Sequence, residues 1–230
     1  MTRAILLDIE GTTTPIDFVH KVLFPYAKER VGKYVEMQFG RLSDEISQLV
    51  DESSHDATYT VPVDPTEPGS VSAYLEYLID VDRKSTPLKA IQGNIWKEGY
   101  ASGDLRSVVF ADVPAAFRRW SAAGKVIAIY SSGSVLAQRL LFRHTDHGDL
   151  SPFIANYFDT NTGPKRASES YGAIAGELGI SPGNVLFLSD VADELDAASN
   201  AGMDTVHVVR DGHAAGQTQH RVVGDLNAVD

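Results

Sequence analysis

Two carboxylates lie close together near the start of the chain, in the stretch LLDIEGTTTP at residues 6–15. Asp8 and Glu10 end an apolar run, and a glycine and three threonines follow them directly. Such a pair can supply a nucleophile and a proton carrier for a reaction. It can equally be the polar end of a strand, where carboxylates meet water or cap a helix. The pair alone leaves both interpretations open.

Three further segments carry groups that complement this pair. One apolar run leads into Ser131 and Ser132, another leads into Asp190, and a polar segment between them contains Lys165. The carboxyl ends of parallel strands meet at one edge of a sheet, and ligands bind in the crevice there. Folding would therefore bring acids, hydroxyls and an ammonium group to the same edge.

This set of groups suits the transfer of a phosphoryl group to a carboxylate. Asp8 would attack phosphorus, but a carboxylate and a phosphate dianion repel each other unless cations intervene. Mg²⁺ prefers oxygen ligands, and Asp8 and Asp190 would hold it together with waters and the substrate phosphate. Lys165 would neutralise the remaining charge, although such a lysine is more often a solvated surface residue.

The remaining groups have a role in the same reaction. Ser131 and Ser132, with backbone N–H groups at the start of the next helix, would hold phosphate oxygens. These serines could equally cap that helix, and the two roles are compatible. Glu10 would protonate the leaving oxygen and then take a proton from the water that attacks the phosphoenzyme.

The elements that must position these groups alternate along the chain. Apolar runs of about five residues alternate with helical patterns, which is typical of a parallel sheet covered by helices. The predicted strands are 4–8, 126–130, 185–189 and 205–209. Two helices should lie between them, one starting at Asp112 as N-cap and ending at Gly124, the other ending at Gly179. We predict an α/β fold with a Rossmann-like parallel-sheet core.

Residues 16–104 interrupt this alternation. Three stretches carry apolar residues at helical spacing, and no run between them resembles a buried strand. The three stretches are 18–39, 70–81 and 87–100. We therefore predict a helical cap domain at 16–104, inserted after the first strand, and a core domain formed by 1–15 and 105–230.

Two polar segments complete the predicted organisation. The segment DESSHDATYTVPVDPTEPGS, at 51–70, is polar and proline-rich, so we predict a loop or connector. The tail after Arg210 is rich in glycine and polar residues, and we predict that it is loosely attached.

The composition narrows the classes of function. The chain has 230 residues, of which 43% are hydrophobic, and a formal net charge of -11. This charge argues against nucleic acid or an anionic membrane surface as a partner. The absence of cysteine excludes disulfides, thiolate metal sites and a cysteine nucleophile. With no signal peptide or membrane span in the sequence, we expect a cytoplasmic protein.

These segments, in this order, resemble the haloacid dehalogenase superfamily of aspartate-nucleophile phosphatases. Within it, the chain resembles the enolase-phosphatase family of methionine salvage. Glutamate instead of aspartate at the second acidic position, followed by GTTTPI, is unusual in the superfamily and narrows the resemblance. The stretches that carry it are LLDIEGTTTPIDFVHKVLFPYA, IYSSGSVLAQRLLF, SESY, FLSDVADELDAA and IQGNIWKEGY.

The resemblance implies a bifunctional, Mg²⁺-dependent enzyme. The family converts 2,3-diketo-5-methylthiopentyl-1-phosphate through its enol to the acireductone 1,2-dihydroxy-3-keto-5-methylthiopentene and phosphate, by way of an aspartyl-phosphate. The substrate would be a small phosphorylated diketone, with no nucleic acid or membrane involved, and we expect a monomer.

The resemblance also assigns roles to residues. Asp8 would be the nucleophile and a metal ligand, Glu10 the second acid and a metal ligand through its carbonyl, and Asp190 the remaining ligand. The phosphate-binding pair and the catalytic lysine, which also contacts phosphate, would be Ser131, Ser132 and Lys165.

Residues near the lysine form a second group in this assignment. Glu194 fits a weaker acidic position that orients the lysine or a metal-bound water. Arg166 and Ala167 stand where relatives often have an acidic residue, so the partner of the lysine is not determined by this comparison.

Two other classes of function remain open. A haloacid dehalogenase-type phosphatase acting on another small phosphate ester would share every core residue, and only the helical insert would distinguish it. A binding domain that merely kept the fold would have lost Asp8, Lys165 or Asp190, and all three are present.

Overall fold

The computed structural model describes residues 1–210 and 218–230. The chain forms two compact units, which we call the sheet unit (Met1–Phe18 and Arg106–Asp230) and the helical unit (Val19–Leu105). The domain boundaries expected from the sequence lie within three residues of these.

Among its described residues, the sheet unit is built on six strands in the order β3-β2-β1-β4-β5-β6, and every neighbouring pair is parallel. β1 lies in the middle, with Leu7 opposite Ile129 of β2 and Leu188 of β4. The predicted α/β class with a Rossmann-like parallel sheet is confirmed. The strands are β1 (Ala4–Leu7), β2 (Val126–Tyr130), β3 (Asn156–Phe158), β4 (Val185–Ser189), β5 (Asp204–Val208) and β6 (Arg221–Val223).

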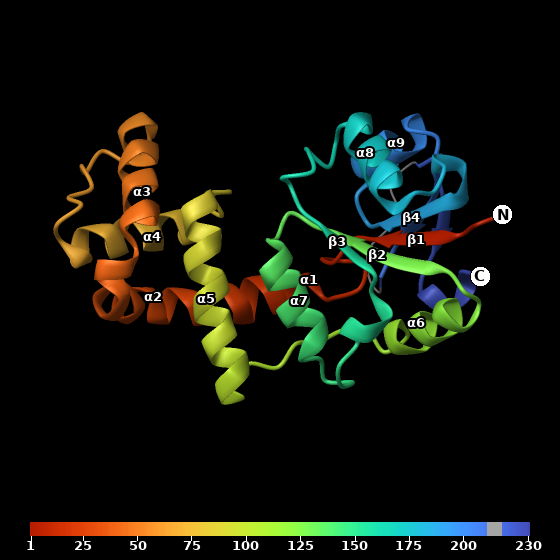
Figure 1. The fold of residues 1–230 in the computed structure, drawn as a ribbon, viewed down its shortest axis with the longest axis horizontal. Helices are drawn as coiled ribbons and strands as arrows, with labels where there is room; N and C mark the ends of the chain where they lie inside the picture. Colours follow the sequence, from red (N-terminus) through yellow and green to blue (C-terminus); the bar gives the residue numbers. More distant parts are fainter. Residues whose placement is uncertain (211–217) are drawn as a thin grey trace. The chain divides into compact units, whose positions relative to one another are not determined.

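Helices cover both faces of this sheet (Figure 1). Alternate residues of each strand point to opposite faces. Ile5 and Leu7 therefore pack in the core with α6 (Val113–Ala122) and α7 (Val135–Arg143). Ala4 and Leu6 pack with α8 (Ser168–Leu178) and α9 (Ala192–Asn200). Both faces of β1 are thus closed to water.

Two helix ends show how local signals compare with the structure. Gly179 follows α8 with a φ of 65°, a left-handed conformation that favours glycine, as expected. Asp112 stands at the predicted N-cap of α6, but its side chain makes no capping hydrogen bond. Its position as N-cap residue is confirmed, but its carboxylate pairs with Arg210 instead of capping the helix.

The C-terminal segment corrects another expectation. Residues 218–230 contribute β6, which pairs with β5, and they bury Leu226 and Val229 completely. The prediction of a loosely attached tail is therefore wrong for this segment, while 211–217 lie outside the described residues. β3 and β6 are three residues long, too short to give a clear apolar pattern.

The helical unit contains four α-helices among its described residues, preceded by a π-helical turn at Val19–Leu23. The indole N–H of Trp96 donates to the carbonyl of Leu23 at 2.9 Å, which ties the last helix to this turn. The helices are α2 (Phe24–Gln38), α3 (Ser43–His55), α4 (Pro68–Asp80) and α5 (Thr86–Ser102).

The connector predicted at 51–70 is only partly correct. Residues 51–55 belong to α3, which was not predicted, and 68–70 begin α4. The buried stripe of α3 consists of Ile46, Leu49 and Ser53, which is too narrow among charged residues to stand out in the sequence.

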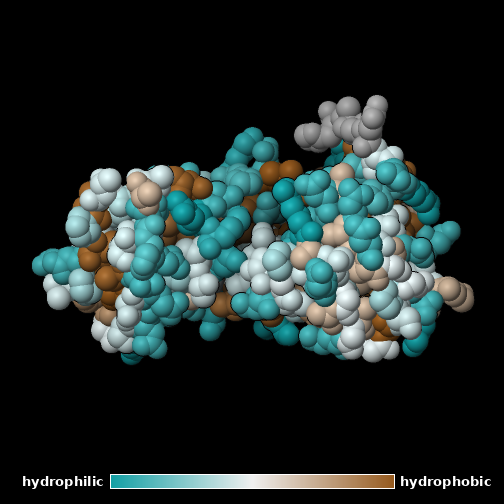
Figure 2. All heavy atoms as spheres, turned by 90° about the horizontal axis from the view of Figure 1, so that it is seen from above, coloured by the Kyte–Doolittle hydropathy of each residue, from teal (hydrophilic) through white to brown (hydrophobic). Residues whose placement is uncertain are grey.

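The surface agrees with the charge of the chain. The face seen in Figure 2 is mostly hydrophilic, with small separate hydrophobic areas. Within the described residues, no helix is long and apolar enough to cross a membrane.

Candidate active site

Asp8 follows β1 directly and is held by its own backbone neighbours. Its side chain is buried, and the N–H of Ile9 donates to its Oδ1 at 2.7 Å. The N–H groups of Thr13 and Thr14 both donate to the carbonyl of Ile9, so the chain makes a tight turn here. The carboxylate is therefore fixed at the carboxyl edge of the central strand.

Lys165 contacts this carboxylate directly. Its Nζ lies 2.7 Å from Asp8 Oδ1 and 2.7 Å from Glu194 Oε2, and its side chain is only 11% exposed. The hydroxyl of Tyr171 donates to the Lys165 carbonyl at 2.7 Å, and that of Tyr130 donates to Gly163 at 2.9 Å. Side chains from α8 and β2 thus hold the loop that presents the lysine.

Ser189 joins the same cluster, and sequence reasoning missed it. Its hydroxyl lies 3.2 Å from Asp8 Oδ2 and 3.2 Å from Glu194 Oε2, and it accepts the N–H of Val191 at 3.1 Å. A hydroxyl has one proton, so it can donate to only one carboxylate at a time. The only signal in the sequence was its place at the end of a buried run, immediately before Asp190.

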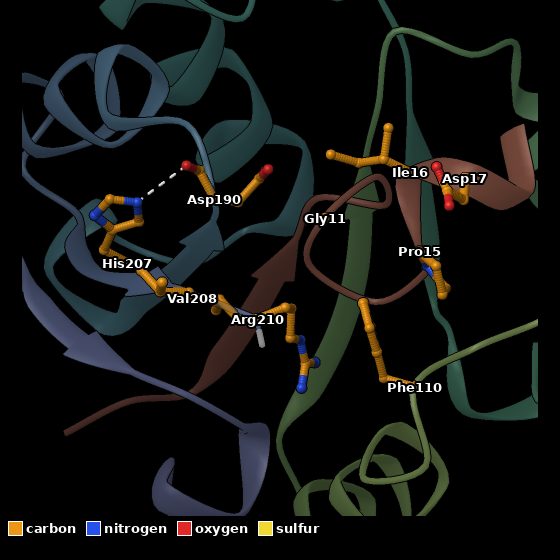
Figure 3. Close-up of a pocket in the computed structure, with 10 residues that line it drawn as sticks. Gly11, Pro15, Ile16, Asp17, Phe110, Asp190, His207, Val208 and Arg210 are labelled. Carbon is orange, nitrogen blue, oxygen red and sulfur yellow. Dashed lines mark hydrogen bonds between the residues drawn. The ribbon is translucent and has the colours of Figure 1, made fainter. Parts of the chain in front are cut away.

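Asp190 lies against the turn that follows Asp8. Gly11 has a φ of 68°, and a Cβ there would lie 2.1 Å from Asp190 Oδ2, so only glycine fits this contact. The Nε2 of His207 donates to the Asp190 carbonyl at 3.0 Å, as Figure 3 shows. His207 was not expected to take part, because it lies inside the apolar run of β5.

The site holds more carboxylates than cations. Burial and the Asp8 charge raise the pKa of Asp190 to about 6, with a smaller contribution from Glu10. Burial and Asp8 likewise raise the pKa of Glu194 to about 7, although Lys165 opposes this. Burial disfavours the charged lysine, but the two carboxylates outweigh it and raise the Lys165 pKa.

The predicted phosphate-binding serines follow the neighbouring strand. β2 lies beside β1, so Ser131 and Ser132 follow the strand end next to Asp8. Ser131 is buried and its hydroxyl accepts the N–H of Gly133 at 3.2 Å, whereas Ser132 is half-buried. The structure joins Asp8, Lys165 and Glu194 by direct contacts, and it places the serines at the adjoining strand end.

The donor set is compatible with Mg²⁺. The described residues contain no group of three His, Cys, Asp or Glu side chains that could hold a metal ion. Asp8 and Asp190 offer carboxylates, Asp190 Oδ1 is buried without a hydrogen-bond partner, and Glu10 offers a backbone carbonyl. Mg²⁺ commonly uses one or two carboxylates and keeps several waters. A cavity of about 410 Å³ lies beside Asp190 and Gly11, and its lining does not include Asp8 or Glu10 (Figure 3).

Comparisons with known proteins agree with this arrangement. Residues 2–202 match the haloacid dehalogenase-like hydrolase family. The chain is 51% identical over 214 residues to enolase-phosphatase E1 of Synechococcus elongatus, covering 91% of this chain and 90% of the relative. The chain belongs to this hydrolase family, on its enolase-phosphatase branch.

A second relative with the enolase-phosphatase name and one solved structure are also similar to this chain. Enolase-phosphatase E1 of Drosophila mojavensis is 47% identical over 224 residues, covering 95% of this chain and 89% of the relative. The crystal structure of the UTR4 protein from Saccharomyces cerevisiae has a TM-score of 0.81 and 34% identity, with both chains fully covered. The resemblance seen in the sequence is confirmed.

Proposed function

We propose that this member of the enolase-phosphatase branch is a Mg²⁺-dependent phosphoric monoester hydrolase that acts on 2,3-diketo-5-methylthiopentyl-1-phosphate. It forms the enol and then releases phosphate to give the acireductone 1,2-dihydroxy-3-keto-5-methylthiopentene. The contact of one buried lysine with both Asp8 and Glu194, at 2.7 Å each, carries the phosphatase part of this proposal. The names of the relatives support the enolase part.

In the first phosphatase step Asp8 attacks phosphorus. A bond forms between its carboxylate oxygen and phosphorus, the bond to the substrate oxygen breaks, and Glu10 gives that oxygen a proton. The Ile9 N–H and Lys165 hold Asp8 Oδ1, so the carboxylate does not rotate as the charge on it changes.

In the second step a water molecule attacks the aspartyl-phosphate. Glu10, now ionised, takes a proton from this water, the phosphorus–oxygen bond to Asp8 breaks, and inorganic phosphate leaves. Lys165, Ser131 and Ser132 bind the phosphate oxygens throughout. Asp8, Asp190 and the Glu10 carbonyl would hold Mg²⁺, which would supply positive charge that offsets the repulsion between carboxylate and phosphate.

Substrate selection, partners and location lie outside the phosphate chemistry itself. We propose that the helical unit selects the substrate, since the core chemistry is common to the superfamily. The net charge of -11 supports a small-molecule substrate and no nucleic-acid or membrane partner. We also propose a cytoplasmic monomer.

The test is incubation of the protein with the diketone phosphate and Mg²⁺, following enol absorbance and inorganic phosphate together. We expect the enol to appear and decay while phosphate accumulates. Phosphate release without an absorbing intermediate would favour the alternative function, a phosphatase for another small phosphate ester. A panel of such esters would then identify the preferred substrate.

A further inference from the structure

The side chain of Gln138 forms hydrogen bonds that hold the loop containing Ser131 and Ser132. The amide nitrogen of Gln138, on α7, donates to the Gly133 carbonyl at 2.8 Å and to the Phe158 carbonyl at 2.8 Å. Both partners can only accept hydrogen bonds, so the amide must turn its nitrogen toward them. Gln138 is 1% exposed, which makes these contacts free of competing solvent.

The packing of α7 does not explain why a polar amide occupies this buried position. Its neighbours Leu141 and Phe142 are part of the apolar core, and the Oε1 of Gln138 is buried without a hydrogen-bond partner. A buried polar atom left without a partner costs roughly 1–3 kcal/mol. An apolar residue of similar length would fill the same volume without that cost, so the two carbonyl contacts must be what the amide contributes.

One of the two carbonyls belongs to the 131–134 loop, and the other belongs to the neighbouring strand β3. The Phe158 carbonyl, at the end of β3, also accepts the N–H of Ser131 at 3.2 Å. Gly133 follows the two serines, and its N–H donates to the hydroxyl of Ser131. One amide therefore joins the end of the serine loop to the same carbonyl that holds its beginning.

A carboxylate completes the support of this loop. Asp159 follows β3, and its Oδ2 accepts the N–H of Val135, the first residue of α7, at 3.3 Å. Its Oδ1 accepts the N–H of Asn161 at 2.9 Å. Asp159 thus fixes the start of the helix, and Gln138 fixes the loop before it.

We propose that Gln138 is a positioning residue for phosphate binding. It holds the 131–134 loop in the conformation in which Ser131 and Ser132 meet the phosphate. This inference rests on the proposed function, in which those serines bind phosphate. Without the amide, phosphate has to order the loop, and this cost weakens substrate and product binding alike. KM and the dissociation constant of phosphate should therefore rise together, while kcat changes less.

The test uses the Gln138→Met and Gln138→Glu variants in the full chain with Mg²⁺. The dissociation constant of inorganic phosphate is measured from the rise in Tm with phosphate concentration, because a ligand that binds only the folded state stabilises it. We expect the constant to rise about tenfold for Met, which corresponds to roughly 1.4 kcal/mol. The dissociation constant should rise further for Gln138→Glu, whose carboxylate faces two carbonyls. The kcat of Gln138→Met should stay within about threefold of wild type.

Leu141→Ala is the matched control, because Leu141 lies on the same helix and is 4% exposed. It should lower Tm by creating a cavity and leave phosphate binding unchanged. If Gln138→Met and Gln138→Glu bind phosphate as wild type does, the role of Gln138 is wrong and the proposed function stands. If the wild-type protein itself shows no rise in Tm with phosphate, both are wrong.

Discussion

Two buried clusters of charged side chains lie in the sheet unit, and they differ in how their charges balance. The first, which we call the reaction cluster, consists of Asp8, Lys165 and Glu194. The second, which we call the loop clamp, consists of Arg210 and Asp112. The side chains of both are 7% to 11% exposed, so burial does not distinguish them.

The loop clamp is complete as it stands. One guanidinium faces one carboxylate at 2.8 Å, and the Nε and Nη2 of Arg210 donate to the Thr12 carbonyl at 3.1 and 2.6 Å. Asp112 also accepts the N–H of Leu226, and Arg210 lies 4.2 Å from the ring centroid of Phe110. The clamp joins the turn after Asp8 to the C-terminal segment and has no charge left over.

In the reaction cluster, by contrast, the negative charges outnumber the positive ones. Lys165 serves two carboxylates at once, and Asp190 adds a third nearby whose Oδ1 has no hydrogen-bond partner. Burial, together with the negative charge of Asp8, raises the pKa values of Asp190 and Glu194. The comparison teaches that an excess of like charge, and not burial, marks where a cation and a reaction belong.

The largest expected effect comes from replacing Asp8, the proposed nucleophile. Asp8→Asn keeps the shape of the side chain but cannot form the aspartyl-phosphate, so kcat should fall by about 10⁴-fold or more. Thermal unfolding should show no loss of Tm, because the change removes one of the surplus charges. A variant that still released phosphate at a substantial rate would contradict the assignment of Asp8.

Breaking the loop clamp should act mainly on stability. Arg210→Met leaves Asp112 buried without its cation, so the free energy of unfolding should fall by about 3–5 kcal/mol, measured by urea denaturation. Arg210→Met combined with Asp112→Leu should recover part of this, because neither charge is then left alone. A loss below about 1 kcal/mol for the single variant would mean that the clamp is not structural.

The reaction cluster predicts a dependence of stability on pH and on Mg²⁺. The raised pKa values, about 6 for Asp190 and about 7 for Glu194, mean that the folded state keeps protons that the unfolded chain has released. Their stabilising effect is present below about pH 4 and is lost as pH rises through 6 to 7. Without metal, we expect the free energy of unfolding to fall by roughly 1–3 kcal/mol between pH 5 and pH 8.

Urea denaturation with a chelator at both pH values checks this fall. Mg²⁺ binds the ionised carboxylates, so the rise in Tm on adding it should be larger at pH 8 than at pH 5. Equal rises at the two pH values, or none at either, would show that these carboxylates do not hold the cation.

The contrast between the clusters also shows what the sequence could and could not predict. Asp8 and Asp190 were predictable because buried runs end at the edge of a parallel sheet and place the next residue there. Lys165 was predicted only from its place in the polar segment between two such runs. The distance between Lys165 and Asp8 depends on the path of the crossover loops, which no local pattern encodes. The same holds for the Arg210–Asp112 pair, whose members lie 98 residues apart.

Residues that act through other residues were missed for a different reason. Ser189 ends an apolar run, His207 lies inside one, and Gln138 lies on the inward face of a helix, so each resembles an ordinary core position. Their partners are mostly backbone carbonyls or distant side chains. Such contacts leave no periodic signal, whereas the four long strands and most of the helices do.

The smallest expected effect sharpens the comparison within the reaction cluster. Ser189→Ala removes a hydroxyl that donates to a carboxylate and accepts the N–H of Val191, so the free energy of unfolding should fall by about 1 kcal/mol. The carboxylate of Asp8 then loses one of its fixed contacts, and kcat should fall about tenfold, roughly 1.4 kcal/mol. Ser72→Ala is the control, because Ser72 is buried and donates to the Pro68 carbonyl within the helical unit. A kcat loss as large for Ser72→Ala as for Ser189→Ala would mean that general stability, and not the contact with Asp8, sets the rate.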